Sequence, residues 1–195
     1  MTDKAENSPL SLKQIKLMRS ATYASIALAL TLISLKIWAW LITDSVAILS
    51  SLADSVLDLI ASIITFYAVK VAVSPADAEH RFGHGKSEGV SGLLQGFIIT
   101  ISALYVASEA VIRLLEPKPI SEPEVGFGVM SISLVLTVFL VGFQRFVVAR
   151  TGSLAISADA MHYKADLLTN LAVLCAIFFS YRFEWDILDP LLGLL

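Results

Sequence analysis

The chain has 195 residues, of which 56% are hydrophobic and only 16% are charged, and its formal net charge is −3. This composition excludes a water-soluble fold of ordinary type, a disordered chain, a collagen-like chain and a disulfide scaffold. The 14 basic residues form no nucleic-acid-binding patch, and the single cysteine, Cys175, cannot form an internal disulfide. The sequence therefore predicts an integral membrane protein.

Apolar stretches predict the membrane-spanning helices, since a helix needs about 20 mostly apolar residues to cross a bilayer. Five stretches satisfy this requirement, at 20–42, 45–73, 90–108, 125–144 and 153–181. A sixth begins near Ile187 and is too short to cross before the last residue, Leu195. We therefore expect an all-α fold, a polytopic transmembrane helix bundle with five full helices plus the start of a sixth.

The distribution of Lys and Arg predicts how these spans are oriented. Nine of these residues lie before the first span and in the connections after the second and fourth, whereas three lie on the opposite side. Because Lys and Arg gather in cytoplasmic connections, we expect the N-terminus to face the cytoplasm. Residues 1–19 lack a signal-peptide cleavage site, and we interpret them as a cytoplasmic tail with a short amphipathic helix at 11–20.

Ionisable side chains inside the spans are informative, because each costs on the order of 2.5–3.5 kcal/mol at the centre of a membrane. Asp54 and Asp58 stand four residues apart in the second span, and His162 and Asp166 stand four apart in the fifth. Residues four apart share one face of a helix. Each of these two spans therefore presents a pair of metal-ligating groups on one side.

A bound divalent cation would explain these four groups, since unpaired carboxylates are strongly unfavourable in hydrocarbon. Two helices that supply two ligands each can surround a cation tetrahedrally. Carboxylate and imidazole ligands suit Zn²⁺, and then Fe²⁺, Mn²⁺, Co²⁺ or Cd²⁺, while the lack of thiolates argues against Cu⁺. A site closed by four protein ligands favours holding a metal over activating water. Aspartates that pair with Lys36 or Lys164 are the alternative without a metal.

Three further ionisable residues in the spans have simpler interpretations. Asp159 lies one turn before His162, and we expect it at the membrane interface or as an N-terminal helix charge rather than as a ligand. For Lys36 and Lys164 we expect side chains that snorkel toward the interface or form an ion pair.

A second cluster of metal-ligating residues lies in the connection after the second span. Asp77, His80 and His84 are close together in sequence there. Gly83 and Gly85 allow a tight turn that could direct His84 inward. The three side chains are a candidate surface metal site, and a solvated polar loop is the alternative interpretation.

These residues fall within three strings, Leu52-Ala-Asp-Ser-x-x-Asp58, Pro75-Ala-Asp-x-x-His-x-Phe-Gly-His-Gly-Lys86 and Ala158-Asp-x-x-His-Tyr-x-x-Asp166. The strings resemble the cation diffusion facilitator family, and most closely its bacterial zinc and ferrous-iron efflux branch. The similarity runs from about Arg19 to the end of the chain.

The resemblance implies a transporter rather than an enzyme, in the bacterial cytoplasmic (inner) membrane, with six transmembrane helices and both termini cytoplasmic. It implies a homodimer that exchanges a cytoplasmic divalent cation for protons and binds no nucleic acid. The family pattern associates this ligand set with Zn²⁺ and Cd²⁺, and Fe²⁺ is also assigned to the branch. The matching residues are Asp54, Asp58, His162 and Asp166 for the transport site, and Asp77, His80 and His84 for a secondary loop site.

The family also has features that this sequence does not contain. Relatives continue with a complete sixth helix and a cytoplasmic domain that has its own metal site and dimer contacts. Lys86 matches a lysine of an interprotomer charge network near that domain. We therefore expect a fragment or a naturally shortened, C-terminally truncated form, in which residues 20–195 are the transmembrane cation efflux domain.

Two other functions stay open at this point. An intramembrane aspartate-dependent hydrolase would share a proton between two carboxylates, but here His162 and a third Asp accompany the pair, and no His-Glu-x-x-His motif is present. The other is a fragment of such a transporter that inserts into the membrane but does not cycle.

Overall fold

The computed structural model describes residues 11–43, 46–115 and 123–183, and no strand occurs among them. The side chains of some helical residues near the 44–45 and 116–122 connections and after Leu171 lie outside this description. The helices are α1 (Leu12–Thr43), α2 (Val46–Ala72), α3 (Lys86–Leu115), α4 (Pro123–Thr151) and α5 (Leu154–Phe183).

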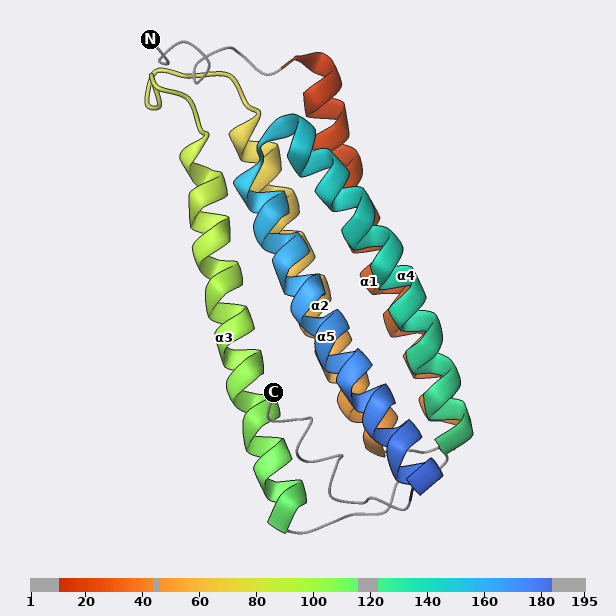
Figure 1. The fold of residues 1–195 in the computed structure, drawn as a ribbon. Helices are drawn as coiled ribbons and strands as arrows, with labels where there is room; N and C mark the ends of the chain where they lie inside the picture. The colour runs from red at the N-terminus through yellow and green to blue at the C-terminus, as the bar shows by residue number, and fades with distance from the viewer. Residues whose placement is uncertain (1–10, 44–45, 116–122, 184–195) are drawn as a thin grey trace.

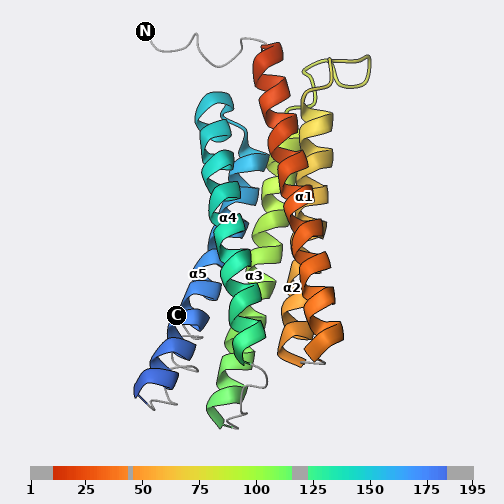
Figure 2. The same cartoon turned by 90° about the vertical axis from the view of Figure 1, so that its right-hand side faces the viewer.

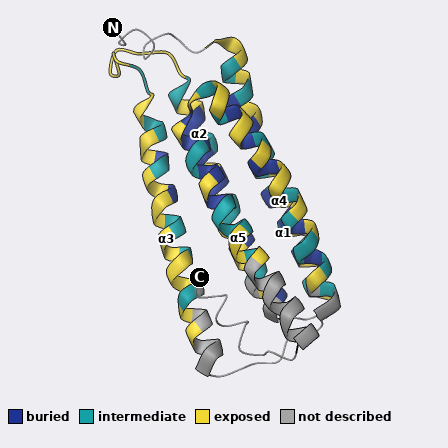
Figure 3. Cartoon of the chain, viewed as in Figure 1, coloured by how far each residue is buried: buried dark blue, intermediate teal, exposed yellow. Residues whose placement is uncertain are grey.

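The five helices run side by side along a common direction, as Figures 1 and 2 show from two sides. The helix α5 contacts each of the other four, whereas α3 lies against α2 and α5. Among the side chains of α3 that the structure describes, most are exposed, as Figure 3 shows, and Ser91 and Gln95 are buried. Any group on the inner face of α5 is therefore positioned by the whole bundle.

Within the part of the chain that the structure describes, four helical segments are long and apolar enough to cross a membrane, namely Leu12–Thr43, Ser51–Ala72, Lys86–Tyr105 and Phe127–Thr151. Large apolar side chains such as Leu41, Leu104 and Phe139 lie on the outer surface, more than 60% exposed. Contact of such an apolar surface with lipid is favourable, whereas its contact with water is unfavourable. The predicted all-α, multi-pass membrane bundle is confirmed, and the predicted start of a sixth helix lies outside the described residues.

Several helices are longer than the apolar stretches that predicted them. The helix α1 begins at Leu12 and includes the short helix expected at 11–20, because residues 12–43 contain neither Gly nor Pro to interrupt it. The helix α4 continues to Thr151, past the apolar stretch that ends at Gln144. An apolar stretch indicates the part of a helix that lies in the hydrocarbon of the bilayer. The helix itself continues until its backbone hydrogen bonding is interrupted.

The turn between α4 and α5 is short, and it determines how α5 enters the bundle. Gly152 has φ of 67° and donates its backbone N–H to the Val148 carbonyl at 2.8 Å, which ends α4 in the left-handed conformation that glycine adopts at low cost. The Glu88 carboxylate of α3 then accepts the Leu154 backbone N–H and the Ser153 hydroxyl, each at 2.8 Å. The first turn of α3 therefore caps the N-terminus of α5.

We expect Gly152→Ala to destabilise the protein by about 1 kcal/mol, because a Cβ disfavours the left-handed backbone. No atom lies within 4 Å of the added Cβ, so the cost comes from the backbone. Gly142→Ala is the matched control, since this α4 residue also has open space and has no positive φ. It is expected to leave stability unchanged or raise it. Thermal unfolding in detergent measures both, and equal effects would contradict this interpretation.

Candidate metal centre

Three of the four predicted intramembrane ligands meet between α2 and α5. His162 Nε2 lies 3.1 Å from Asp58 Oδ1 and 3.5 Å from Asp166 Oδ2. One ligand atom from each residue lies within 4.8 Å of those of the other two. The His162 side chain is 2% exposed, that of Asp58 13% and that of Asp166 32%. The three groups form a mostly buried cluster with the chemistry and spacing of a divalent-cation site.

Helix packing explains why these side chains converge. His162 and Asp166 are four residues apart and so share one face of α5, and that face lies against α2. Tyr163 is buried beside them, and its hydroxyl contacts the Ser62 hydroxyl at 2.9 Å and donates to the Ser25 carbonyl at 3.4 Å. This side chain therefore restricts the rotation of α5 relative to α1 and α2.

Asp54 lies one turn before Asp58 on α2 but is exposed and lies outside the three-residue cluster. Its spacing on the helix agrees with the prediction, and its side chain stays a predicted fourth ligand. For Asp54 to bind the same cation as the other three residues, its carboxylate would have to turn toward the cluster.

Lys36 corrects the expectation of a snorkelling or ion-paired side chain. It is 6% exposed, and its ammonium donates to the Ser51 carbonyl at 2.8 Å and to the Ser55 hydroxyl at 2.6 Å. Both acceptors are neutral groups of α2. The side chain is held inside the bundle because α1 and α2 pack closely enough for the ammonium to reach α2. For Lys164, a side chain that snorkels or forms an ion pair stays a prediction.

Asp159 corrects the expectation of an interfacial charge, since it is fully buried. Its carboxylate accepts the Ser25 hydroxyl at 2.8 Å, the Gln144 amide at 2.6 Å and the Gln95 amide at 3.4 Å. The Gln95 amide also donates to the Thr65 hydroxyl at 2.9 Å. The network takes a side chain from each of the five helices, and the donors compensate for burying the carboxylate.

The sequence interpretation missed Gln95 and Gln144 because it searched the spans for charged residues only. Both side chains are fully buried. A glutamine within an apolar span, as Gln95 is, or at the end of one, as Gln144 is, is the signal that could have found them, since an unpaired amide is costly in hydrocarbon.

The loop residues Asp77, His80 and His84 also come together, as predicted. His80 Nδ1 lies 3.1 Å from Asp77 Oδ1, and His84 Nε2 lies 3.4 Å from Asp77 Oδ2. One ligand atom from each lies within 4.8 Å of the others. Gly83 has φ of 78°, and the His84 side chain after it is only 15% exposed. The expected inward turn at Gly83 is therefore present in the loop.

The loop favours an ionised Asp77. The His80 backbone N–H donates to Asp77 Oδ1 at 2.6 Å, and this hydrogen bond, with smaller contributions from the two imidazoles, holds the pKa of the carboxyl below its usual range. Asp77 therefore keeps its negative charge to lower pH than an ordinary aspartate. An ionised carboxylate is the form that binds a cation.

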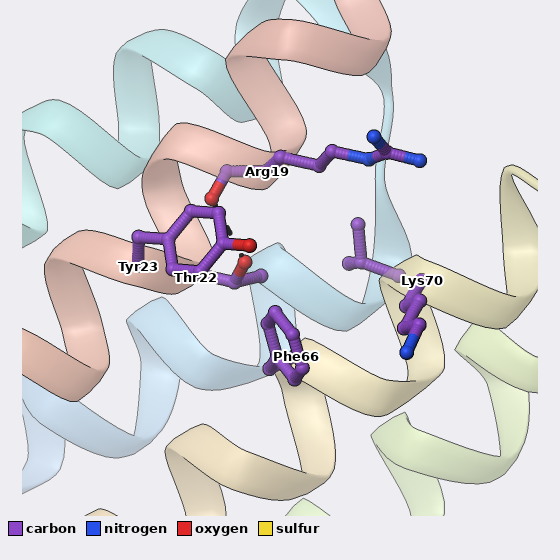
Figure 4. A pocket seen from close by; sticks show the side chains of 6 residues that line it. Arg19, Thr22, Tyr23, Phe66 and Lys70 are labelled. Carbon is purple, nitrogen blue, oxygen red and sulfur yellow. Dashed lines mark hydrogen bonds between the residues drawn. The ribbon is translucent and has the colours of Figure 1, made fainter.

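A hollow of about 170 Å³ between α1 and α2 has a different character (Figure 4). Its lining includes Arg19 and Lys70 and no carboxylate, cysteine or histidine. Two positive charges repel a cation, so this hollow is no candidate for binding metal. Its lining residues are Arg19, Thr22, Tyr23, Phe66, Val69 and Lys70.

Comparison with known proteins identifies similar sequences over nearly the whole chain. A family model described as the cation efflux transmembrane domain matches residues 22–195. The cation-efflux pump FieF of Salmonella arizonae is 42% identical over 179 residues, and the FieF pumps of Salmonella choleraesuis and Salmonella newport are 41% identical over the same length. Each alignment covers 92% of this chain and 59% of the relative. The chain therefore spans 59% of the length of these relatives.

Proposed function

Because this chain belongs to the cation efflux family, we propose that it exports divalent metal cations across the bacterial cytoplasmic (inner) membrane. The observation that carries the proposal is the buried cluster of Asp58, His162 and Asp166. Asp54 joins these three residues as the fourth ligand when a cation is bound. A cation bound there replaces the contacts between His162 and the two carboxylates.

Zn²⁺ is the proposed cargo, with Cd²⁺ and Fe²⁺ as further cargoes. Three carboxylates and one imidazole offer the oxygen and nitrogen ligands that Zn²⁺ accepts in tetrahedral geometry. Ligand type alone does not rank these cations, because availability and geometry also set selectivity. The name of the FieF relatives, cation-efflux pump, agrees with a metal cation as cargo.

Protons are the proposed exchange partners in an alternating-access cycle. The ligands must be deprotonated to bind a metal, so cation and protons compete for the same atoms. His162 suits this exchange, since imidazole is the side chain whose charge changes near neutral pH. The cluster loads metal while it faces the cytoplasm and releases it when protons enter from the more acidic side. The N-terminus is proposed to face the cytoplasm, and the working form to be a homodimer.

Flux measurements on proteoliposomes test this function. The full 195-residue chain is reconstituted, and zinc uptake is followed with an internal fluorescent indicator under an imposed pH gradient. We expect uptake that stops when the gradient is collapsed by a proton ionophore. Protein that binds zinc but shows no gradient-dependent uptake would contradict transport by this chain and favour a fragment that binds metal without cycling.

The loop cluster is proposed as a second, cytoplasmic metal site that does not carry the cargo through the bundle. We expect Asp77→Ala to lower the zinc that the purified protein holds, because Asp77 contacts both histidines. The zinc held at the intramembrane cluster should be retained. Elemental analysis after dialysis against limiting zinc measures this, with Asp58→Ala analysed beside it. Equal zinc content in Asp77→Ala and wild type would contradict the loop site.

A further inference from the structure

Lys36 is a charged side chain in a place where charge is costly. It lies on α1, about two turns before the end of the helix at Thr43, is 6% exposed, and donates to the Ser51 carbonyl and the Ser55 hydroxyl of α2. Neither acceptor carries a charge, so these hydrogen bonds hold the ammonium in place without neutralising it. A neutral donor could form the same two hydrogen bonds at lower cost. The positive charge itself therefore calls for an explanation.

The ammonium lies next to the proposed transport site. Ser55 lies between Asp54 and Asp58 on α2, three residues before Asp58, and residues with this spacing are neighbours on a helix surface. Asp58 contacts His162, which also contacts Asp166, and Asp54 directly precedes Ser55 on α2. Asp54, Asp58 and Asp166 are the three carboxylates of the proposed transport site.

The charges of the proposed transport site and Lys36 add up to a value that a cation of one particular charge neutralises. With three ionised carboxylates, a neutral imidazole and the Lys36 ammonium, the empty site has a net charge of about −2. A divalent cation makes the filled site neutral, whereas a monovalent or trivalent cation leaves a net charge inside the membrane. Net charge is costly in a medium of low dielectric constant.

We propose that Lys36 is a specificity-determining residue, a fixed positive charge that matches the intramembrane site to divalent cations. It sets the site's preference for the charge of the bound cation, without contacting the cation. This inference rests on the proposed function, because it takes Asp54, Asp58, His162 and Asp166 as the ligands.

A comparison of Cd²⁺ binding with Tb³⁺ binding tests the proposal, because these cations have similar radii and differ in charge. Binding of each is measured by calorimetry on the full chain in nanodiscs, and the signal lost in Asp58→Ala is assigned to the intramembrane site. The quantity compared is the ratio of Tb³⁺ affinity to Cd²⁺ affinity. Both cations compete with the same protons, so the ratio isolates the effect of charge.

We expect Lys36→Met and Lys36→Gln to raise this ratio on the order of tenfold or more, since repulsion by Lys36 grows with the charge of the cation. Lys36→Gln keeps a hydrogen-bond donor for Ser55, so it separates the charge from the contact. Lys36→Arg keeps the charge and is expected to keep the ratio. Lys70→Met is the matched control, since it removes a lysine charge about 18 Å from Asp58 along α2.

An unchanged ratio in Lys36→Gln would overturn the proposal, as would an equal rise in Lys70→Met. Failure of the proposed function gives a different result. If wild type and Asp58→Ala bind Cd²⁺ equally at every site, the four-residue site itself is wrong, and the role of Lys36 falls with it.

Discussion

Asp58→Ala is expected to reduce gradient-driven zinc uptake to the level of protein-free vesicles. Asp58 supplies the oxygen that lies 3.1 Å from His162 Nε2, and it is the member of the cluster that comes from α2. Without it α2 contributes only Asp54, whose side chain lies outside the cluster, so the two α5 ligands lose the partner that holds a cation between the helices. Loss of a direct ligand should exceed the roughly 10–100-fold loss of metal affinity that removing a supporting residue causes. Zinc uptake into proteoliposomes under a pH gradient measures the effect.

Two further variants make this result specific. His162→Ala should also reduce uptake to background, because its imidazole contacts both Asp58 and Asp166. Glu79→Ala removes an exposed loop carboxylate that lies outside both clusters and should retain wild-type uptake. Full uptake in Asp58→Ala would rule out this cluster as the transport site. Asp54→Ala, which is also expected to lose uptake, tests whether the fourth ligand is needed.

Asp159→Ala is expected to lower the free energy of unfolding by about 3 kcal/mol, because buried donors would lose their acceptor. The Ser25 hydroxyl and the Gln144 amide donate to this carboxylate at 2.8 and 2.6 Å inside the bundle. The Gln95 amide is a longer third contact at 3.4 Å. Denaturant titration in detergent micelles, followed by tryptophan fluorescence, measures the loss.

Asp159→Asn and Thr169→Ala are the comparisons for this prediction. The asparagine keeps one acceptor oxygen and directs an N–H₂ group toward other donors, so its cost should be intermediate. Thr169→Ala removes an exposed α5 hydroxyl that donates only to the Ala165 carbonyl of its own helix, and its effect should be within about 0.5 kcal/mol. Equal stability of Asp159→Ala and Thr169→Ala would show that the network contributes little.

The spans were predictable because bilayer crossing is a property of each segment separately. Apolar stretches of sufficient length identified all five helices, and the observed α2, Val46–Ala72, differs from the predicted 45–73 by one residue at each end. The predicted ends of α3 and α4 were less accurate. Their helices continue into polar residues, since helical hydrogen bonding does not stop at the membrane surface.

The candidate metal ligands could be proposed from the sequence because their spacing is local. A spacing of four residues places Asp54 and Asp58, and likewise His162 and Asp166, on one face of a helix in any context. Sequence alone also indicated that α2 and α5 must meet, since a cation needs ligands from both. The sequence did not indicate that Asp54 would stand apart from the other three side chains, because the direction of a side chain depends on its neighbours in the bundle.

The roles of Asp159 and Lys36 depended on tertiary structure. Asp159 is stabilised in the interior by donors from α1, α3 and α4, and Lys36 by acceptors on α2. These partners lie 15 to 134 residues away in sequence. The sequence by itself determined the membrane class, the helices and the paired spacing of the candidate ligands, because each follows from composition or from spacing within one helix. Only the packing of five helices decided which charges are buried, since burying a charge requires partners that other helices supply.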